Sequence, residues 1–191
     1  AVFVAELGGD GPDVDHAAGL ERDRFDAFCD HLILVDNRRN PAGLDHVVGA
    51  YRVMPGARRA EAGRFYSETE YDLDPLLRLG RNLLELGRSC VHADHRGGTA
   101  MFHLWNGLAD YVLDRGIEVM FGVASFHGTD VAALAGPLSM LHHHHLAPLE
   151  MRVTARAPHC QTMNLIAPEA LDRKAAMAAT PALIKAYLRL G

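Results

Sequence analysis

The run LLELGRSCV at positions 83–91 decides the fold. It is apolar at both ends, which is typical of a buried strand, yet Glu85, Gly87 and Arg88 stand at its centre. A regular strand has a period of two, so it would place Glu85 and Arg88 on opposite faces. One extra residue at Gly87, a β-bulge, would bring both side chains to one face. The run therefore predicts a bulged central strand that presents an acid and a base to a cleft.

The surrounding pattern predicts a mixed sheet with flanking helices. Positions 31–36 and 47–54 predict an antiparallel hairpin, since turn residues separate two apolar runs. Positions 101–113 predict an amphipathic helix, because apolar side chains recur there at helical spacing, and positions 117–125 predict a further strand. The other predicted elements are helices at 1–7, 57–62, 130–142 (capped by Thr129), 168–179 and 180–190, a helix starting at Asp74-Pro75, and a weak strand at 151–155. This order predicts an α/β (α+β) fold in a single domain over residues 1–191.

Composition excludes several classes of protein. The 49% hydrophobic and 23% charged fractions are typical of a soluble globular chain. A formal net charge of -5 argues against nucleic-acid binding by phosphate neutralisation. No apolar run approaches the roughly 20 residues that span a bilayer. Cys29, Cys90 and Cys160 are widely spaced, which favours free thiols in a reducing cytoplasm over disulfides or a zinc site.

Both ends of the chain look cut. The first residue is Ala1, within an apolar helical pattern, and Gly191 directly follows another such pattern. We therefore expect a fragment that lacks terminal elements of its fold.

A glycine-containing loop follows the central strand. Arg96-Gly97-Gly98-Thr99 lies between that strand and the predicted helix, so its backbone N–H groups and the positive helix end could bind an anion. A tight turn with no ligand would have the same sequence, and the position of the loop directly after a charged strand favours the anion site.

This combination of bulged strand and glycine loop resembles the GCN5-related N-acetyltransferase (GNAT) fold, in which the loop holds the pyrophosphate or phosphopantetheine of an acyl carrier. Four stretches resemble, more narrowly, the ornithine–acyl-carrier-protein N-acyltransferases of ornithine-lipid synthesis, also called haemolysin-like acyltransferases: FYSETEYDL at 65–73, LELGRSCVH at 84–92, LHHHHLAP at 141–148 and LIKAYLRLG at 183–191. The resemblance implies a mostly antiparallel sheet and transfer of a 3-hydroxyacyl chain from acyl-carrier protein to the α-amino group of ornithine, giving a lyso-ornithine lipid.

The same resemblance implies the partners. The donor is the phosphopantetheine thioester of acyl-carrier protein, with no other cofactor, and Arg96, Gly97, Gly98 and Thr99 would hold it. The carrier is acidic as a class, so a basic docking patch is expected, with Arg58, Arg59, Arg64 and Arg96 as candidates. The product is amphiphilic, which implies peripheral contact with the inner face of the cytoplasmic membrane and no membrane span.

A more distant resemblance is to the acyl-homoserine-lactone synthases, whose acceptor is S-adenosylmethionine. Their pattern of charged residues is matched by Asp23, Asp26, Arg52, Glu85 and Arg88, but the stretches at 65–68 and 142–145 depart from it. A third interpretation, from a different class, is a non-catalytic acyl-carrier-binding module.

Either enzyme would let an amine attack a thioester. The α-ammonium must first lose a proton, and Glu85 is the candidate base, provided that partial burial tunes it. Backbone N–H groups freed at the bulge could stabilise the oxyanion. Arg88 could act beside Glu85 in catalysis or hold the substrate, and in the alternative interpretation Glu85 and Arg88 only pair with each other in the sheet.

The predicted acceptor site uses complementary charges. Arg52 and Arg88 suit an amino-acid carboxylate, because a guanidinium binds one in bidentate fashion, and Ser89 adjoins them. Asp23 and Asp26 would complement a second ammonium, or form a solvated acidic loop. Glu68 and Glu70 could share that role or cap a neighbouring strand. For His142–His145 we predict packing or the lining of a channel, and no metal site, since no carboxylate or thiolate lies nearby at ligand spacing.

Overall fold

The computed structural model describes residues 2–6, 8–10, 13–158 and 160–189. These residues form two compact units. Unit 1 comprises the described residues up to Thr69 together with Arg81–Gly122, and unit 2 comprises Glu70–Gly80 together with the described residues from Val123 onward. The assignment of a single domain stays a prediction.

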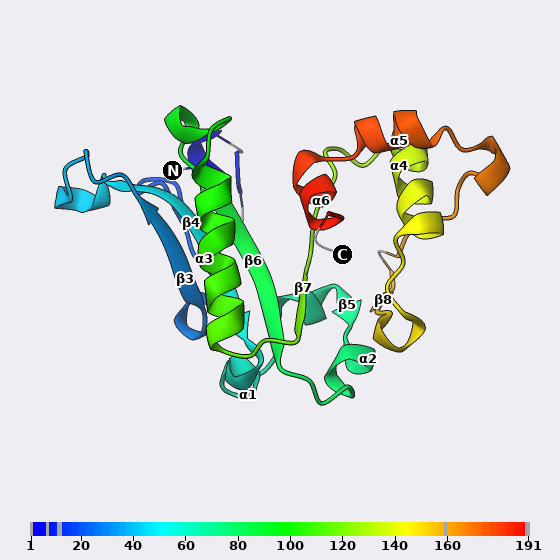
Figure 1. Ribbon diagram of the computed structural model, residues 1–191, viewed down its shortest axis with the longest axis horizontal. Helices are drawn as coiled ribbons and strands as arrows, with labels where there is room; N and C mark the ends of the chain where they lie inside the picture. The colour runs from blue at the N-terminus through cyan, green and yellow to red at the C-terminus, as the bar shows by residue number, and fades with distance from the viewer. Residues whose placement is uncertain (1, 7, 11–12, 159, 190–191) are drawn as a thin grey trace. The chain divides into compact units, whose positions relative to one another are not determined.

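Unit 1 is built on a four-stranded sheet in the order β3-β4-β6-β7 (Figure 1). Its strands are β3 (Asp30–Val35), β4 (Val47–Pro55), β6 (Leu83–Val91) and β7 (Val119–Gly122). The β3–β4 and β4–β6 pairs are antiparallel, and the β6–β7 pair is parallel. The predicted hairpin, the central strand and the mixed, mostly antiparallel sheet are all confirmed.

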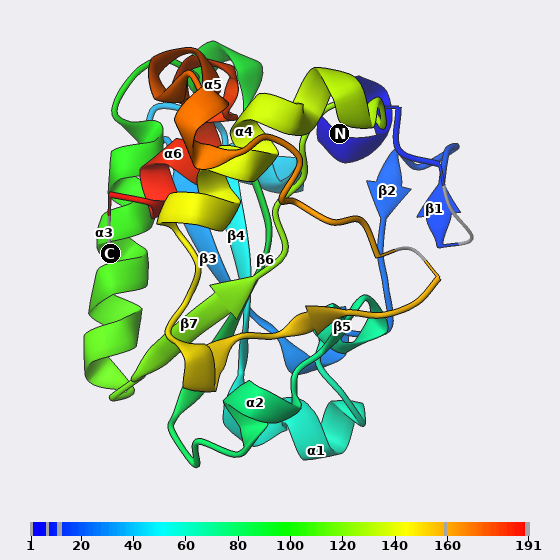
Figure 2. The ribbon, with the colours of Figure 1, turned by 90° about the vertical axis from the view of Figure 1, so that its right-hand side faces the viewer.

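Helix α3 (Ala100–Asp114) covers one face of this sheet (Figures 1 and 2). Its apolar stripe packs on alternate strand residues, and the buried cluster consists of Tyr51, Val53, Leu84, Val91, Ala100, Leu104, Leu108 and Tyr111. Since Tyr51 and Val53 face α3, Arg52 and Met54 face the opposite side. Glu85 is the register partner of Met54 and therefore shares that opposite face.

Strand β7 is shorter than the predicted strand at 117–125. The residues before it are used to turn the chain out of α3: Ile117 N–H donates to the carbonyl of Val112, and Glu118 N–H donates to the carbonyl of Asn82. Pairing with β6 therefore begins only at Val119.

Several short elements complete unit 1. The pattern at 1–7 forms a π-helical turn, η1 (Val2–Glu6), and Ala1 and Leu7 lie outside the described residues. Strand β1 (Val14–Asp15) pairs with β2 (Leu20–Glu21) in a separate two-stranded sheet. The predicted helix at 57–62 is present as η4 and α1. The remaining short elements are η2 (Asp26–Phe28), η3 (Ala42–Leu44), η4 (Gly56–Arg58), α1 (Arg59–Ala62), η5 (Tyr66–Thr69) and η6 (Ala93–His95).

Unit 2 is mainly helical. Its one strand pair among the described residues joins β5 (Tyr71–Asp72) to β8 (Thr154–Ala155). Helix α4 (Val131–His144) packs against α5 (Arg173–Ala179), and continues through Pro137. Its cap is Asp130, whose carboxylate accepts two N–H groups, and not Thr129 as predicted. The other elements are α2 (Asp74–Leu77), η7 (Leu149–Met151), η8 (Pro168–Ala170) and α6 (Ala182–Tyr187).

The predicted last helix ends earlier than expected, at Tyr187, and Leu190 and Gly191 lie outside the described residues. Across the part of the chain that the structure describes, no helix combines the length and apolar character needed to cross a bilayer.

Candidate active site

The bulge lies where the sequence predicts it. Tyr51 pairs with Ser89 and Val53 pairs with Leu86, so Gly87 and Arg88 together face the single residue Arg52. A Cβ built on Gly87 would lie 3.0 Å from Arg52 Nε and 3.2 Å from the Arg52 carbonyl oxygen. Glycine is needed here because the Arg52 side chain passes directly over it.

Glu85 is held as a buried acceptor on the face opposite α3. The residue is only 4% exposed. Oε2 accepts the N–H of Tyr66 at 3.0 Å, and Oε1 accepts the N–H of Ser67 at 2.6 Å. An ionised carboxylate has about four acceptor positions, so these two donors fix its orientation and leave capacity for a further proton donor such as a substrate amine.

Five charged residues form what we call the acid–arginine network: Glu21, Asp23, Asp26, Arg52 and Arg88. Arg52 Nη1 donates to Asp23 Oδ1 at 2.8 Å and to Asp26 Oδ1 at 2.5 Å. Arg88 lies 3.0 Å from Glu21 Oε1 and 3.3 Å from Asp23 Oδ2. The structure thus brings together the four predicted acceptor-site charges, and adds Glu21.

This pairing corrects two interpretations. Arg88 pairs with Glu21 and Asp23, so Glu85 and Arg88 do not form the alternative ion bridge with each other. Asp23 and Asp26 are not a solvated acidic loop, because both bind the buried Arg52. The sequence held one signal for Glu21, since residues two apart on an extended chain share a face and Glu21 precedes Asp23 by two.

The network changes the acidity of Asp26, which belongs to it, and of the neighbouring Cys29 thiol. Burial alone would raise the pKa of Asp26, but the N–H of Asp23 and the guanidinium of Arg52 lower it below its ordinary value. Burial raises the pKa of the Cys29 thiol to about 11; Arg52 opposes this, while Glu85 and Asp23 add to it. The thiol is thus within electrostatic reach of both Glu85 and the network.

Ser89 lies apart from this group. As the register partner of Tyr51, it is directed to the face that α3 covers. The structure therefore does not bring Ser89 to Glu85 or to the acid–arginine network.

The glycine loop lines a cavity of about 520 Å³ at the start of α3. Three of the four predicted carrier-binding residues, Arg96, Gly98 and Thr99, contribute to its lining, together with residues of β3 and the loop that follows it. Gly97 is in the left-handed region, with φ 76°, so a side chain there would strain the turn. Thr99 is the N-cap residue of α3, but its side chain makes no cap hydrogen bond.

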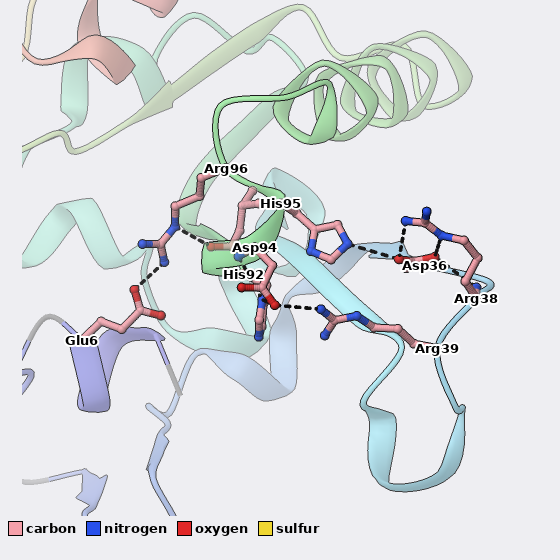
Figure 3. Close-up of polar contacts among 9 residues, drawn as sticks. Glu6, Asp36, Arg38, Arg39, His92, Asp94, His95 and Arg96 are labelled. Atoms are coloured by element: carbon pink, nitrogen blue, oxygen red, sulfur yellow. Dashed lines mark hydrogen bonds and ion pairs between the residues drawn. The ribbon is translucent and has the colours of Figure 1, made fainter.

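Charges around this cavity are largely paired (Figure 3). Asp36 accepts both N–H groups of the Arg38 side-chain fork, at 2.9 Å each, and contacts His95 at 3.2 Å. The pKa of Asp36 is held well below its usual range, chiefly by hydrogen bonds from the side chain and the backbone N–H of Arg38. The hydrogen bond with His95 lowers it further. Arg96 donates to the carbonyl of Val91 at 2.9 Å and pairs with Glu6 at 2.6 Å.

Besides Arg96, two further candidate docking arginines are engaged inside unit 1. Arg58 lies 3.1 Å from Glu61, and Arg59 makes a bidentate contact with Glu68 at 2.9 and 2.7 Å. The Glu68 carboxylate thus binds Arg59 and also accepts the N–H of Phe65.

Within the described ranges, no group of three or more histidine, cysteine, aspartate or glutamate side chains is arranged to hold a metal ion. His142, His143 and His144 form the last turn of α4, and His143 Nε2 lies 2.9 Å from the carbonyl oxygen of Ile166. This contact with Ile166 indicates a packing role for His143.

Comparison with known proteins agrees with this geometry. Residues 1–106 match the family described as "Acetyltransferase (GNAT) domain", so the bulged strand and glycine loop are those of a GNAT-type transferase. The chain is 63% identical over 191 residues to the L-ornithine N(alpha)-acyltransferase of Rhodobacter capsulatus, covering all of this chain and 73% of that protein. It is 40% identical over 192 residues to the enzyme of the same name from Brucella abortus, covering all of this chain and 68% of that protein.

The chain therefore belongs to the family of these L-ornithine N(alpha)-acyltransferases. Among solved structures, the ribosomal-protein-alanine N-acetyltransferase of Brucella melitensis biovar Abortus 2308 has a TM-score of 0.34 at 19% identity, over 57% of this chain and 61% of that chain.

Proposed function

We propose that this protein acylates the α-amino group of ornithine, with acyl-carrier protein as the donor and a lyso-ornithine lipid as the product. The acceptor is supported by the family to which the chain belongs. The single observation that carries the chemistry is Glu85, buried on the bulged strand β6 and oriented by two backbone N–H groups beside the acid–arginine network.

The reaction forms one bond and breaks another. Glu85, directly or through a water molecule, takes a proton from the α-ammonium, and the resulting amine attacks the thioester carbonyl carbon. The tetrahedral intermediate bears an oxyanion that backbone N–H groups at the Gly87–Arg88 bulge could stabilise. Its collapse breaks the C–S bond, and the departing phosphopantetheine thiolate takes up the second proton, which the nitrogen of the new amide releases.

Exposure distinguishes the two arginines as binding groups. The Arg52 side chain is 7% exposed and binds two aspartates, so it serves mainly to hold Asp23 and Asp26 in place. The Arg88 side chain is 31% exposed, which leaves donors for a bidentate contact with the ornithine carboxylate. Glu21 and Asp23 would then accept the δ-ammonium.

The donor site is inferred from the glycine loop. Gly97, Gly98, Thr99 and the N-terminus of α3 would receive the phosphate of phosphopantetheine, because backbone N–H groups and the helix dipole favour an anion. The cavity of about 520 Å³ at this point supports the assignment. An amphiphilic product also favours work at a membrane surface by peripheral contact.

The test is to incubate the purified full-length protein with 3-hydroxyacyl-carrier protein and either ornithine or S-adenosylmethionine. We expect Nα-acylornithine from the first and no lactone from the second. Acylation of neither amine would refute an enzymatic role and leave the carrier-binding module. Glu85→Gln should reduce turnover by at least about 100-fold while binding of the carrier is retained, and near-normal turnover would exclude Glu85 as the base.

A further inference from the structure

The two N–H groups that hold Glu85 come from a weak element. Tyr66 and Ser67 belong to η5 (Tyr66–Thr69), a single 3-10 turn of four residues. Such short turns have poorer hydrogen-bond geometry than an α-helix and are not stable alone. The direction of their N–H groups therefore depends on whatever fixes the turn from outside.

Glu68 fixes the turn at its N-terminal side. Its Oε2 accepts the N–H of Phe65 at 2.7 Å, and the same oxygen accepts Arg59 Nε at 2.9 Å. Its Oε1 accepts Arg59 Nη2 at 2.7 Å. This bidentate pair is the strong, geometrically specific form of the ion pair, and the Glu68 side chain is only 12% exposed. One carboxylate thus ties the residue before η5 to helix α1.

Aromatic packing supports the turn without aiming its N–H groups. Phe65 is fully buried and meets Phe121 edge to face, with ring centroids 5.0 Å apart. Tyr66 meets Phe25 in the same way at 5.9 Å. Such contacts tolerate small rotations of a ring, whereas the polar contacts of Glu68 restrain the backbone on which the N–H direction depends.

We infer that Glu68, held by Arg59, is a positioning residue for Glu85. It fixes the turn whose Tyr66 and Ser67 N–H groups orient the Glu85 carboxylate toward the incoming ammonium. The inference rests on the proposed role of Glu85 as the base. A base displaced by about 1 Å can lose about 100-fold in rate, so loss of the Glu68–Arg59 pair should lower kcat without weakening the binding of ornithine.

The variant to measure is Glu68→Gln, which keeps the shape of the side chain and removes its charge. At saturating donor we expect kcat to fall about 10- to 100-fold with the KM for ornithine changed less than about twofold. Arg59→Lys keeps the charge and loses the planar fork, so its kcat should fall less. The matched control is Glu61→Gln, which breaks the neighbouring Arg58–Glu61 pair at 3.1 Å and should leave kcat unchanged.

A second comparison separates positioning from a general structural effect. In a Glu85→Gln background there is no base to position, so adding Glu68→Gln should cause no further loss of kcat. A further fall as large as that in the wild-type background would overturn the inference, as would wild-type kcat in Glu68→Gln alone. If Glu68→Gln does not fold, Arg59→Lys in the two backgrounds decides by the same criteria.

A readout without turnover keeps this inference distinct from the proposed function. Hydrogen exchange of the Tyr66 and Ser67 amides should be faster in Glu68→Gln than in the wild type, and unchanged in Glu61→Gln. If exchange is faster in Glu68→Gln but the wild type does not acylate ornithine, the positioning of η5 by Glu68 is retained and the proposed function is refuted. Unchanged exchange in Glu68→Gln would refute the positioning of η5 by Glu68.

Discussion

Gly87→Ala should destabilise unit 1, because the bulge has no room for a methyl group. The added Cβ would lie 3.0 Å from Arg52 Nε and 3.2 Å from the Arg52 carbonyl oxygen. The carbonyl belongs to the neighbouring strand, and the guanidinium is tethered to Asp23 and Asp26, so neither can move freely. Overpacking of this kind typically costs about 1–3 kcal/mol, and any shift of Arg52 would also disturb the acid–arginine network.

Urea unfolding followed by tryptophan fluorescence measures this cost. Trp105 is the single tryptophan of the chain. It lies in α3 and packs against the buried cluster between α3 and the sheet of unit 1, so its fluorescence reports on that unit. With a typical m value of about 2 kcal/mol per molar urea, a loss of about 2 kcal/mol lowers the midpoint by about 1 M.

The matched control is Gly107→Ala in the middle of α3, where a Cβ meets no atom within 4 Å. There the same substitution should raise the midpoint, because alanine is favoured over glycine in a helix by about 1 kcal/mol. A midpoint for Gly87→Ala equal to or above that of the wild type, with the control behaving as expected, would refute the close passage of Arg52 over Gly87.

The acidity of three side chains can be tested in the same protein. Because the folded-state pKa of Asp26 is lowered, its stabilising contribution is present above about pH 4 and is lost as pH falls through the folded value; urea midpoints should show a weaker acid dependence in Asp26→Asn. Burial and the 2.6 Å hydrogen bond to Asp30 raise the pKa of Tyr111 to about 12. Its contribution to stability is therefore full below about pH 10 and is lost between about pH 10 and 12. Tyr111→Phe should show no such loss in its urea midpoints. Since the pKa of Cys29 is raised to about 11, iodoacetamide at pH 8 should label the exposed Cys160 well before Cys29, as mass spectrometry of the peptides would show; faster labelling of Cys29 would contradict its burial.

Local pattern was sufficient to predict the strand and the bulge on which the candidate site is built. The limits of β6 are those predicted from the apolar run at 83–91, and the bulge followed from the three-residue spacing of Glu85 and Arg88. Both inferences depend only on the period of a strand, which is a property of the chain itself. Strand β7 begins later than predicted because the residues before it are used by a turn that also involves Asn82, distant in sequence.

The partners of each charge could not be predicted in the same way. Asp23, Asp26, Arg52 and Arg88 were expected to bind substrate, and the structure pairs them chiefly with one another. The contact of Glu68 with Arg59 and the orientation of Ser89 likewise depend on how loops and strands meet. Residue type states which charge is available, whereas tertiary structure decides whether it is already neutralised.

The remaining charge on this face of the sheet fits the proposed acceptor. The acid–arginine network contains three carboxylates and two guanidinium groups, which leaves one formal negative charge, and Glu85 adds a second. Ornithine near neutral pH carries two ammonium groups and one carboxylate, and therefore one net positive charge. Its binding reduces the unbalanced charge of a partly buried site, where uncompensated charges are costly. Transfer of a proton from the α-ammonium to Glu85 then moves charge within the site without changing its total. An acceptor without a second ammonium would leave Glu21 and Asp23 with excess negative charge, so the same network that positions Arg88 also favours a diamino acid over a simple amino acid.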